Sequence, residues 1–353
     1  MARKRNAIGL DIGSSSVKLV HLRETKKGIE LVNFAVAALP PEAIVDGALM
    51  NANAIVEAIR EILGQLKLKV KEAAVSISGH SVIIKKIGLP AMTQEELDES
   101  IKWEAEQYIP FDVSDVYLDY QILQSRPEQG QMDVLLVAAK KEIVDEYAGI
   151  VGEAGLDPVV VDVDCFTIQN AFEVNYGYPP GESIVLIDIG ATTTNVNIIS
   201  NGMTTFTRDI NVGGAQYTDE IRKRLNVSHA EAEAYKMGGR QGADESSVMP
   251  QEVERIMSSV SETMAGEIHR SLDFYLATSS EGRVSKIYLP GGTANVPSLA
   301  PTIENRVGVE VELLDPFKAV EVDPRLFNLD FINLNRPAAA VAVGLGLRGA
   351  NDR

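Results

Sequence analysis

Two aspartates, Asp11 and Asp188, each end an apolar run and are followed by glycine and small hydroxyl-bearing residues. The first segment is Gly9-Leu10-Asp11-Ile12-Gly13-Ser14-Ser15-Ser16-Val17-Lys18, and the second is Ile187-Asp188-Ile189-Gly190-Ala191-Thr192-Thr193-Thr194-Asn195. Small residues at a strand turn let backbone N–H groups converge on an anion, and hydroxyls add further donors. One such copy is typical of an ordinary hairpin turn. Two matching copies about half the chain apart instead indicate a duplicated domain that binds phosphate.

Within these two segments, different residues are expected to bind the phosphates and the metal ion of a nucleotide. We expect residues at both turns and at the start of both second strands to bind the phosphates. In the first segment these are Gly13, Ser14, Ser15, Ser16 and Lys18, and in the second they are Gly190, Ala191, Thr192, Thr193, Thr194 and Asn195. A carboxylate repels phosphate, so Asp11 and Asp188 are expected to hold Mg²⁺, through water because this ion keeps much of its hydration. Lys18 could reach a phosphate as a point charge. Asn195 at the equivalent place breaks the symmetry of the repeat.

A third segment, Lys286–Asn295, supports a nucleotide as the ligand. It is an apolar strand that runs into a double glycine. Because glycine lets the backbone approach a flat ring or a sugar closely, Gly291, Gly292 and Thr293 are expected beside an adenosine. Pro297 suits the first turn of a following helix. A tight strand-to-helix turn is the alternative interpretation of the same residues.

Alternating strand and helix patterns surround these segments and predict an α/β fold with sheets covered by helices. Strand-type runs occupy 7–11, 16–22, 31–37, 73–78, 183–188, 195–199 and 284–289. Apolar residues repeat at helical spacing over 55–66 and 253–276.

Residues 81–157 differ in pattern from their surroundings and are expected to form an inserted subdomain. Strands are predicted at 82–87, 116–123 and 133–138. Between the first two strands, Thr93 and Glu96 form the capping-box pattern that opens a helix. A second helix carries an apolar face over 143–151, with Gly155 at its end.

Length and charge limit the classes of function. A chain of 353 residues is long enough for two domains. The formal net charge of −17 argues against nucleic acid or anionic lipid as the main partner, since both need a basic surface. No run approaches the ~18 apolar residues of a membrane span, and one cysteine, Cys165, fits a reducing cytoplasm.

The three glycine-containing segments together resemble the actin-like ATPase superfamily, which includes actin, sugar kinases, heat-shock chaperone ATPases and bacterial FtsA. The resemblance implies ATP and Mg²⁺ bound between two α/β domains. It implies a first domain at 1–80 and 158–182, an FtsA-type inserted subdomain at 81–157, a second domain core at 183–220 and 283–353, and a smaller helical subdomain at 221–282. It also implies that Glu233 and Lys236 contact the ribose, although an exposed i,i+3 pair on a helix explains them equally well.

Other segments resemble the PilM family of type IV pilus assembly proteins. They are Gly88–Met92, Trp103–Phe111, Asp209–Gly214 and the small-residue run Ala338–Gly346. The resemblance covers nearly the whole chain and implies a cytoplasmic, ATP-binding scaffold of pilus assembly and twitching motility. The implied partners are the N-terminal cytoplasmic peptide of the inner-membrane protein PilN, bound in a groove involving the inserted subdomain, and other inner-membrane and motor components. Membrane association is expected only through these partners, because Arg348–Arg353 is too short and polar for a membrane helix.

Catalysis is the least defined part of the sequence prediction. Active members of the superfamily carry a polar residue that orients the attacking water, but residues 161–166 lack the Glu-Pro-Thr pattern of the chaperones. Asp164 and Gln169 are the candidates, and the sequence leaves open whether ATP is hydrolysed slowly or not at all. Two other functions also stay open. One is an FtsA-like filament-forming ATPase, and the other is a small-molecule phosphotransferase of the sugar-kinase type.

Overall fold

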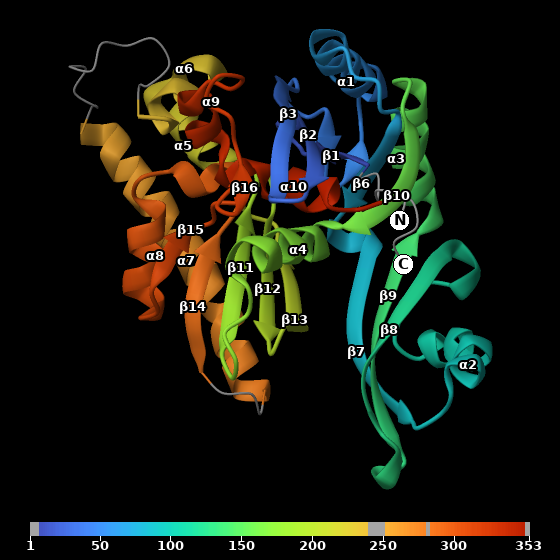
Figure 1. The fold of residues 1–353 in the computed structure, drawn as a ribbon. Helices are drawn as coiled ribbons and strands as arrows, with labels where there is room; N and C mark the ends of the chain where they lie inside the picture. Colours follow the sequence, from blue (N-terminus) through green and yellow to red (C-terminus); the bar gives the residue numbers. More distant parts are fainter. Residues whose placement is uncertain (1–6, 239–250, 280–282, 350–353) are drawn as a thin grey trace.

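The computed structural model describes residues 7–238, 251–279 and 283–349. Two sheets dominate the fold (Figure 1). The first has the strand order β10-β6-β1-β2-β3-β16, with β1 (Ile8–Ile12), β2 (Ser16–Thr25), β3 (Gly28–Ala38), β6 (Glu72–Ile77), β10 (Asp157–Val163) and β16 (Val320–Glu321). The second has the order β13-β12-β11-β14-β15, with β11 (Ser183–Ile189), β12 (Thr194–Ser200), β13 (Met203–Ile210), β14 (Val284–Leu289) and β15 (Val311–Leu313).

Both sheets are built around the same arrangement of three strands. β1 pairs antiparallel with β2 and parallel with β6, and β11 pairs antiparallel with β12 and parallel with β14. The strands that carry Asp11 and Asp188 therefore lie inside their sheets with neighbours on both sides. This repeated arrangement confirms the two-domain α/β architecture predicted from the sequence.

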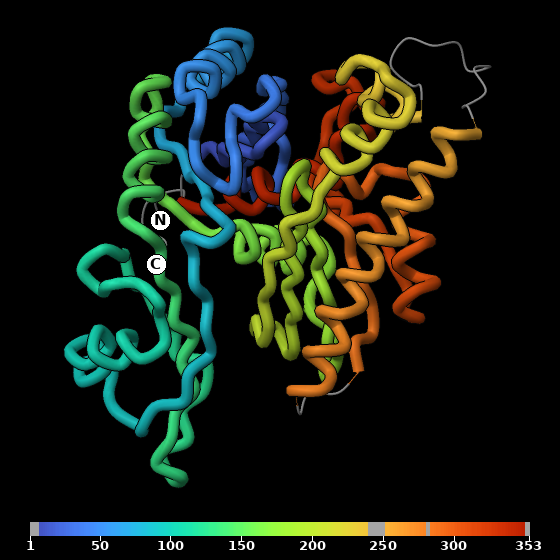
Figure 2. Tube along the Cα trace, turned by 180° about the vertical axis from the view of Figure 1, so that it is seen from behind, coloured from blue at the N-terminus to red at the C-terminus, as the bar shows by residue number. Residues whose placement is uncertain are grey.

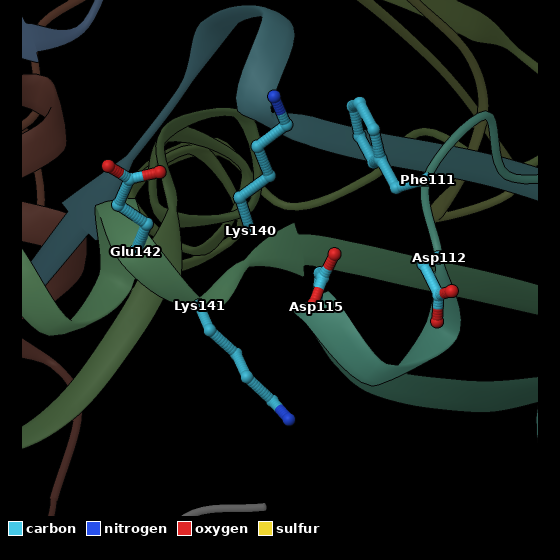
Figure 3. Close-up of a pocket in the computed structure, with 6 residues that line it drawn as sticks. All are labelled: Phe111, Asp112, Asp115, Lys140, Lys141 and Glu142. Atoms are coloured by element: carbon cyan, nitrogen blue, oxygen red, sulfur yellow. The ribbon is translucent and has the colours of Figure 1, made fainter.

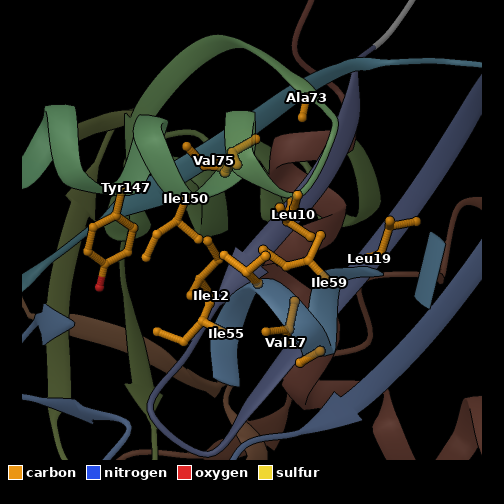
Figure 4. Packing of buried hydrophobic residues seen from close by; sticks show 14 of the residues in the cluster. Leu10, Ile12, Val17, Leu19, Ile55, Ile59, Ala73, Val75, Tyr147 and Ile150 are labelled. Carbon is orange, nitrogen blue, oxygen red and sulfur yellow. The ribbon is translucent and has the colours of Figure 1, made fainter. Parts of the chain in front are cut away.

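Helices α1 (Ala52–Leu66) and α3 (Lys141–Glu153) pack against the first sheet and against each other. Figure 4 shows their buried side chains facing the apolar residues of the strands, with Ile55, Ile59, Tyr147 and Ile150 on the helices and Leu10, Ile12, Val17, Leu19, Ala73 and Val75 on the sheet. The helical stripe predicted over 55–66 is thus the buried face of α1. A short hairpin, β4 (Ile44–Val45) and β5 (Ala48–Leu49), precedes that helix.

Helices α4 (Asp164–Tyr176) and α10 (Ala340–Gly346) lie between the two sheets. α10 packs on α4 and on β1, and one buried cluster joins Phe172 of α4 to Ala74 of the first sheet and Leu186 of the second. The two helices approach closely because Gly344 has no side chain. A Cβ at that position would overlap the backbone of Thr167, only 2.9 Å from its Cα atom.

The second sheet is covered by α7 (Gln251–Thr278), with α8 (Leu299–Val307) beside it. Two shorter helices, α5 (Ala215–Leu225) and α6 (His229–Lys236), pack against each other near one end of α7, and α9 (Leu329–Asn335) lies near them (Figure 1). The amphipathic pattern predicted over 253–276 is the buried stripe of α7.

A separate antiparallel sheet projects from the first sheet, as Figure 2 shows from behind. It has the order β7-β9-β8, with β7 (Val82–Pro90), β8 (Val116–Arg126) and β9 (Gln131–Lys140), and it carries α2 (Gln94–Glu106). The predicted capping box opens α2. The Thr93 hydroxyl accepts from the Glu96 N–H at 3.2 Å, and the Glu96 carboxylate accepts from the Thr93 N–H at 2.8 Å.

Two parts of the chain differ from the simplest sequence expectation. Pro297 is not in the first turn of a helix: a 3-10 turn at Gly292–Asn295 starts at the second glycine, and α8 begins at Leu299, after its N-cap Ser298. The segment 283–353, expected in the second domain, also contributes β16 to the edge of the first sheet, where Val320 pairs with Ile29.

Candidate nucleotide-binding site

The first hairpin places Asp11 directly opposite Lys18 in the register of β1 and β2. The Lys18 ammonium lies 2.9 Å from the Asp11 carboxylate, and both side chains are largely buried, at 13% and 12% exposure. The turn closes by a hydrogen bond of 3.1 Å from the Gly13 N–H to the Ser16 carbonyl. Lys18 is therefore held at the turn, where an incoming anion would meet it.

The second hairpin repeats this geometry with different side chains. Asp188 pairs with Asn195 across β11 and β12, and the Gly190 N–H donates to the Thr193 carbonyl at 2.9 Å. Asn195 donates its side-chain N–H to the carboxylate of Asp209 on β13 at 2.7 Å. The lysine–aspartate pair of the first hairpin is thus replaced by an amide–carboxylate pair, and Asp209 is a polar neighbour that the sequence analysis did not identify.

The two hairpins meet at their turns. The Thr192 hydroxyl donates to the Ser14 hydroxyl at 3.1 Å, although the two turns belong to hairpins of different sheets. Hydroxyl and backbone N–H donors of both turns are consequently gathered in one place, which suits the oxygens of a polyphosphate.

Carboxylates concentrate beneath the two turns. Burial, followed by the nearby charges of Asp164 and Asp11, raises the pKa of Asp188 to about 7. Burial and then the charge of Asp11 raise the pKa of Asp164 to about 6, against hydrogen bonds from Ser76 and Ser78 that lower it. Part of Asp164 and of Asp188 is accessible to solvent, but protein atoms crowd their carboxyl groups and the charges repel one another.

This concentration of negative charge fits a divalent cation. Among the largest influences on Asp188, the charge of Lys18 favours its ionised form, and a bound cation would add positive charge to this effect. Within the described ranges, no group of three or more His, Cys, Asp or Glu side chains is arranged to ligate a metal directly. Coordination through water, as expected for Mg²⁺, is the mode that these carboxylates suit.

The double glycine of the third segment lies against the second hairpin. Gly291 has a φ of +95°, and a Cβ there would come within 2.6 Å of the Asp188 carboxylate. Gly292, by contrast, is exposed. The Thr293 hydroxyl donates to the Gly190 carbonyl at 2.8 Å, and the same carbonyl accepts the Gly214 N–H at 2.9 Å. These contacts hold the expected adenosine loop and the expected phosphate loop together.

Glu233 and Lys236 face the site from α6. The Lys236 ammonium lies 2.7 Å from the Glu233 carboxylate and donates to the Thr218 hydroxyl of α5 at 3.2 Å. It also lies 3.5 Å from the carbonyl of Gly214, which is bonded to the second hairpin. The side chain of Lys236 is only 12% exposed, so the pair is not a solvated surface pair.

The two candidates for orienting water occupy different surroundings. Gln169 donates to the Gly202 carbonyl at 3.1 Å and accepts from the Thr204 hydroxyl at 2.6 Å, which ties it to the turn between β12 and β13. Asp164 instead shares its surroundings with Asp11 and Asp188. Of the two, Asp164 is the residue that the structure brings to the hairpins.

A pocket of about 410 Å³ lies where the inserted sheet joins the rest of the chain. It is lined by Phe111, Asp112, Asp115, Lys140, Lys141 and Glu142 (Figure 3). The Lys140 ammonium lies 4.6 Å from the centre of the Phe111 ring. Lys141 points to the opposite side, where it donates to the Ser114 carbonyl at 2.7 Å.

Comparison with solved structures identifies the architecture as an actin-like ATPase fold. EutJ of Carboxydothermus hydrogenoformans matches over 97% of this chain and 89% of its own, with a TM-score of 0.60 and 16% identity. MreB5 of Spiroplasma citri, solved with ADP, matches over 96% and 94% with a TM-score of 0.51 and 14% identity. At these identities the likeness concerns the fold.

The family model of the type IV pilus assembly protein PilM matches residues 9–350, and the chain belongs to this family. A solved PilM–PilN type IV pilus biogenesis complex is similar over 98% of this chain and 99% of its own, with a TM-score of 0.86 and 29% identity.

FtsA proteins are more distant relatives. The cell division protein FtsA of Bacillus subtilis is 25% identical over 257 residues, or 65% of this chain, and the match spans 57% of that relative's length. FtsA of Streptococcus pneumoniae is 24% identical over 90% of this chain and 77% of its own. In the part of the chain that the structure describes, every helix is too short or too polar to cross a membrane.

Proposed function

We propose that this chain is an ATP-binding scaffold of type IV pilus assembly that binds the N-terminal cytoplasmic tail of PilN. Family membership places it in pilus assembly. The observation that carries the nucleotide part is the meeting of the two hairpins at Ser14 and Thr192 above the buried carboxylates. That arrangement offers hydroxyl and backbone donors to phosphates and negative charge to a cation within one site.

The proposed roles of the side chains follow from their contacts. The turn residues of both hairpins bind phosphate, and Lys18 moves from the Asp11 carboxylate to the phosphates or shares its charge between them. Asp11 and Asp188 hold Mg²⁺ through water, and this ion neutralises phosphate charge when it is bound. The adenosine side is lined by Gly291–Thr293 and by Glu233 and Lys236. The Thr293 hydroxyl is bonded to the Gly190 carbonyl of the second hairpin, and the Lys236 ammonium is close to Gly214, whose N–H is bonded to the same carbonyl.

The pocket of the inserted subdomain is the proposed place of the PilN tail. A cavity of about 410 Å³ is within the volume range of ligand-binding pockets. Phe111 supplies an aromatic face. The Lys140 ammonium above it could donate a hydrogen bond to a peptide carbonyl or carboxylate. A solved relative at 29% identity is a complex with PilN, which supports this partner.

The rest of the assignment follows from the same proposal. We propose the sequence-based domain limits with two changes. The inserted subdomain ends with β9 at Lys140, because α3 packs on the first sheet, and β16 belongs to the first sheet. The chain is expected at the cytoplasmic side of the inner membrane, held there through PilN. Family membership disfavours the sugar-kinase-type phosphotransferase.

Calorimetric titration of the full chain with ATP and MgCl₂ tests the nucleotide part. Asp11→Ala should weaken binding about tenfold or more, a loss of about 1.4 kcal/mol or greater, because it removes a carboxylate of the cation site. Asp273→Ala, on the exposed surface of α7, is the matched control and should leave the affinity unchanged. Equal affinity in the wild type and Asp11→Ala refutes the proposed site.

Titration with a synthetic PilN tail peptide tests the partner part. Lys140→Ala should weaken peptide binding, whereas Lys102→Ala on the exposed side of α2 should not. A wild-type protein that binds no peptide with or without nucleotide refutes the scaffold function.

A further inference from the structure

One hydrogen bond joins the start of the inserted subdomain to the opposite half of the molecule. The side-chain N–H of Asn211 donates to Nε2 of His80 at 3.2 Å, since the amide nitrogen is a donor only. His80 lies in the short turn Gly79–Ser81, between the end of β6 in the first sheet and the start of β7 in the inserted sheet. A contact at this turn acts where the inserted subdomain is attached.

Asn211 begins a loop that is hydrogen-bonded to the second phosphate hairpin at several points. The Gly214 and Ala215 N–H groups donate to the carbonyls of Gly190 and Ala191 at 2.9 and 2.7 Å. The Thr194 hydroxyl donates to the Val212 carbonyl at 2.7 Å. The loop also packs closely against the hairpin, since a Cβ on Gly213 would lie 2.6 Å from the backbone of Ala191.

The same attachment turn is also linked to the floor of the candidate nucleotide site. Ser78, one residue before the turn, hydrogen-bonds the Asp164 carboxyl. Asp164 lies close enough to Asp188 for their charges to interact. The attachment is therefore contacted from the second hairpin through Asn211 and from the buried carboxylates through Ser78.

The chain returns from the inserted sheet beside this attachment. Val82, the first residue of β7, pairs with Ala139 of β9, and Lys140 of the pocket follows immediately. A shift of the turn that contains His80 would thus displace the strand pair that ends at the pocket.

We propose that the contact between His80 and Asn211 couples nucleotide occupancy to partner binding at the pocket of the inserted subdomain. The inference rests on the proposed function and adds the route by which its two sites communicate. A nucleotide that draws the hairpins together moves the loop 211–214 with the second hairpin, and Asn211 then repositions the attachment turn. Such coupling requires the nucleotide to bind one arrangement of the halves better than the other, and it acts equally in both directions.

The test measures the coupling factor, which is the ratio of PilN-peptide dissociation constants without and with AMPPNP and MgCl₂. It uses the full chain as wild type, His80→Ala, Asn211→Ala and the double variant. A hydrogen bond of this kind changes an equilibrium by about 2- to 12-fold. We expect the wild-type coupling factor to differ from one. In each single variant the factor should be about threefold or more closer to one. The double variant should fall no further than the single ones.

Control variants separate this contact from general damage. His80→Gln keeps a hydrogen-bond acceptor and should retain part of the coupling. Thr204→Val removes a different contact between α4 and the second sheet, the bond to Gln169, and should keep the wild-type factor. AMPPNP titrations with and without the peptide should give the same factor in reverse.

Two outcomes overturn the inference while leaving the proposed function intact. In one, the wild type binds nucleotide and peptide independently. In the other, His80→Ala and Asn211→Ala keep the wild-type coupling factor. Failure of the wild type to bind either ligand alone would instead refute the proposed function.

Discussion

Replacing Asp188 by asparagine should stabilise the protein in the absence of ligand. Burial and the neighbouring carboxylates raise the pKa of Asp188 from 3.8 to about 7, which corresponds to about 4 kcal/mol at 1.36 kcal/mol per pKa unit. This is an upper limit, because part of the residue is accessible to solvent and the carboxylates share the effect. We expect Asp188→Asn to raise the free energy of unfolding by about 1–3 kcal/mol at pH 8.

The sign of the pH dependence follows from proton binding. Between pH 3.8 and about 7, the folded protein keeps a proton on Asp188 that the unfolded chain has lost, so wild-type stability falls as the pH rises through this window. Asparagine does not titrate. The advantage of Asp188→Asn should therefore be about 1 kcal/mol larger at pH 8 than at pH 6.

Urea unfolding at these two pH values, with EDTA and without nucleotide, measures this difference. Both pH values lie well above the sequence pI of about 4.8. Near the pI itself, low solubility would interfere with the measurement. Asp11→Asn provides the contrast, because it leaves the buried ammonium of Lys18 without its partner and should destabilise by about 1–3 kcal/mol. An Asp188→Asn variant that is less stable than wild type at pH 8, or whose advantage does not grow with pH, would contradict the reasoning.

Two glycine substitutions test close backbone contacts, one at the candidate site and one between α10 and α4. Each variant is compared by urea unfolding with a control substitution at another glycine. Gly291→Ala should destabilise by about 2 kcal/mol or more, because its φ is +95° and its Cβ would overlap the neighbouring strand. Gly292→Ala, whose new Cβ would meet its nearest neighbour, the Cβ of Ala338, at 3.8 Å, should cost less than about 1 kcal/mol. Gly344→Ala should destabilise by about 3 kcal/mol or more, since its Cβ would enter the backbone of Thr167. Gly266→Ala, a mid-helix glycine of α7 with open space around it, should instead stabilise by about 0.5–1 kcal/mol. Similar effects of the paired variants would contradict the packing described.

Local pattern was sufficient to predict the elements that carry the site. The strand–turn–strand pattern around Asp11 and Asp188 predicted two hairpins. In the structure Asp11 lies opposite Lys18, and Asp188 lies opposite Asn195. The fold class followed from the repeat, because two similar units imply two similar sheets. The capping box at Thr93 was also visible, since its two partners are three residues apart in sequence.

Residues brought in by tertiary contacts escaped the sequence analysis. Asp209 reaches the site because β13 pairs with β12, and no local pattern marks an aspartate near a strand end as the partner of Asn195. Ser76 and Ser78 contact Asp164 only because β10 lies beside β6. The choice between Asp164 and Gln169 likewise needed geometry, because both stand on the same helix and differ in what that helix faces.

The packing of α10 against β1 has a consequence for the order in which the protein can fold as it is synthesised. Val20 and Leu22 of β2 are buried together with Ala342 and Val343, and the Ala7 N–H donates to the Arg348 carbonyl at 2.9 Å. β1 and β2 leave the ribosome long before these residues exist, so one face of the first sheet stays uncovered during most of translation. A nascent chain of this protein should therefore depend on chaperone protection until the last strand and helix emerge.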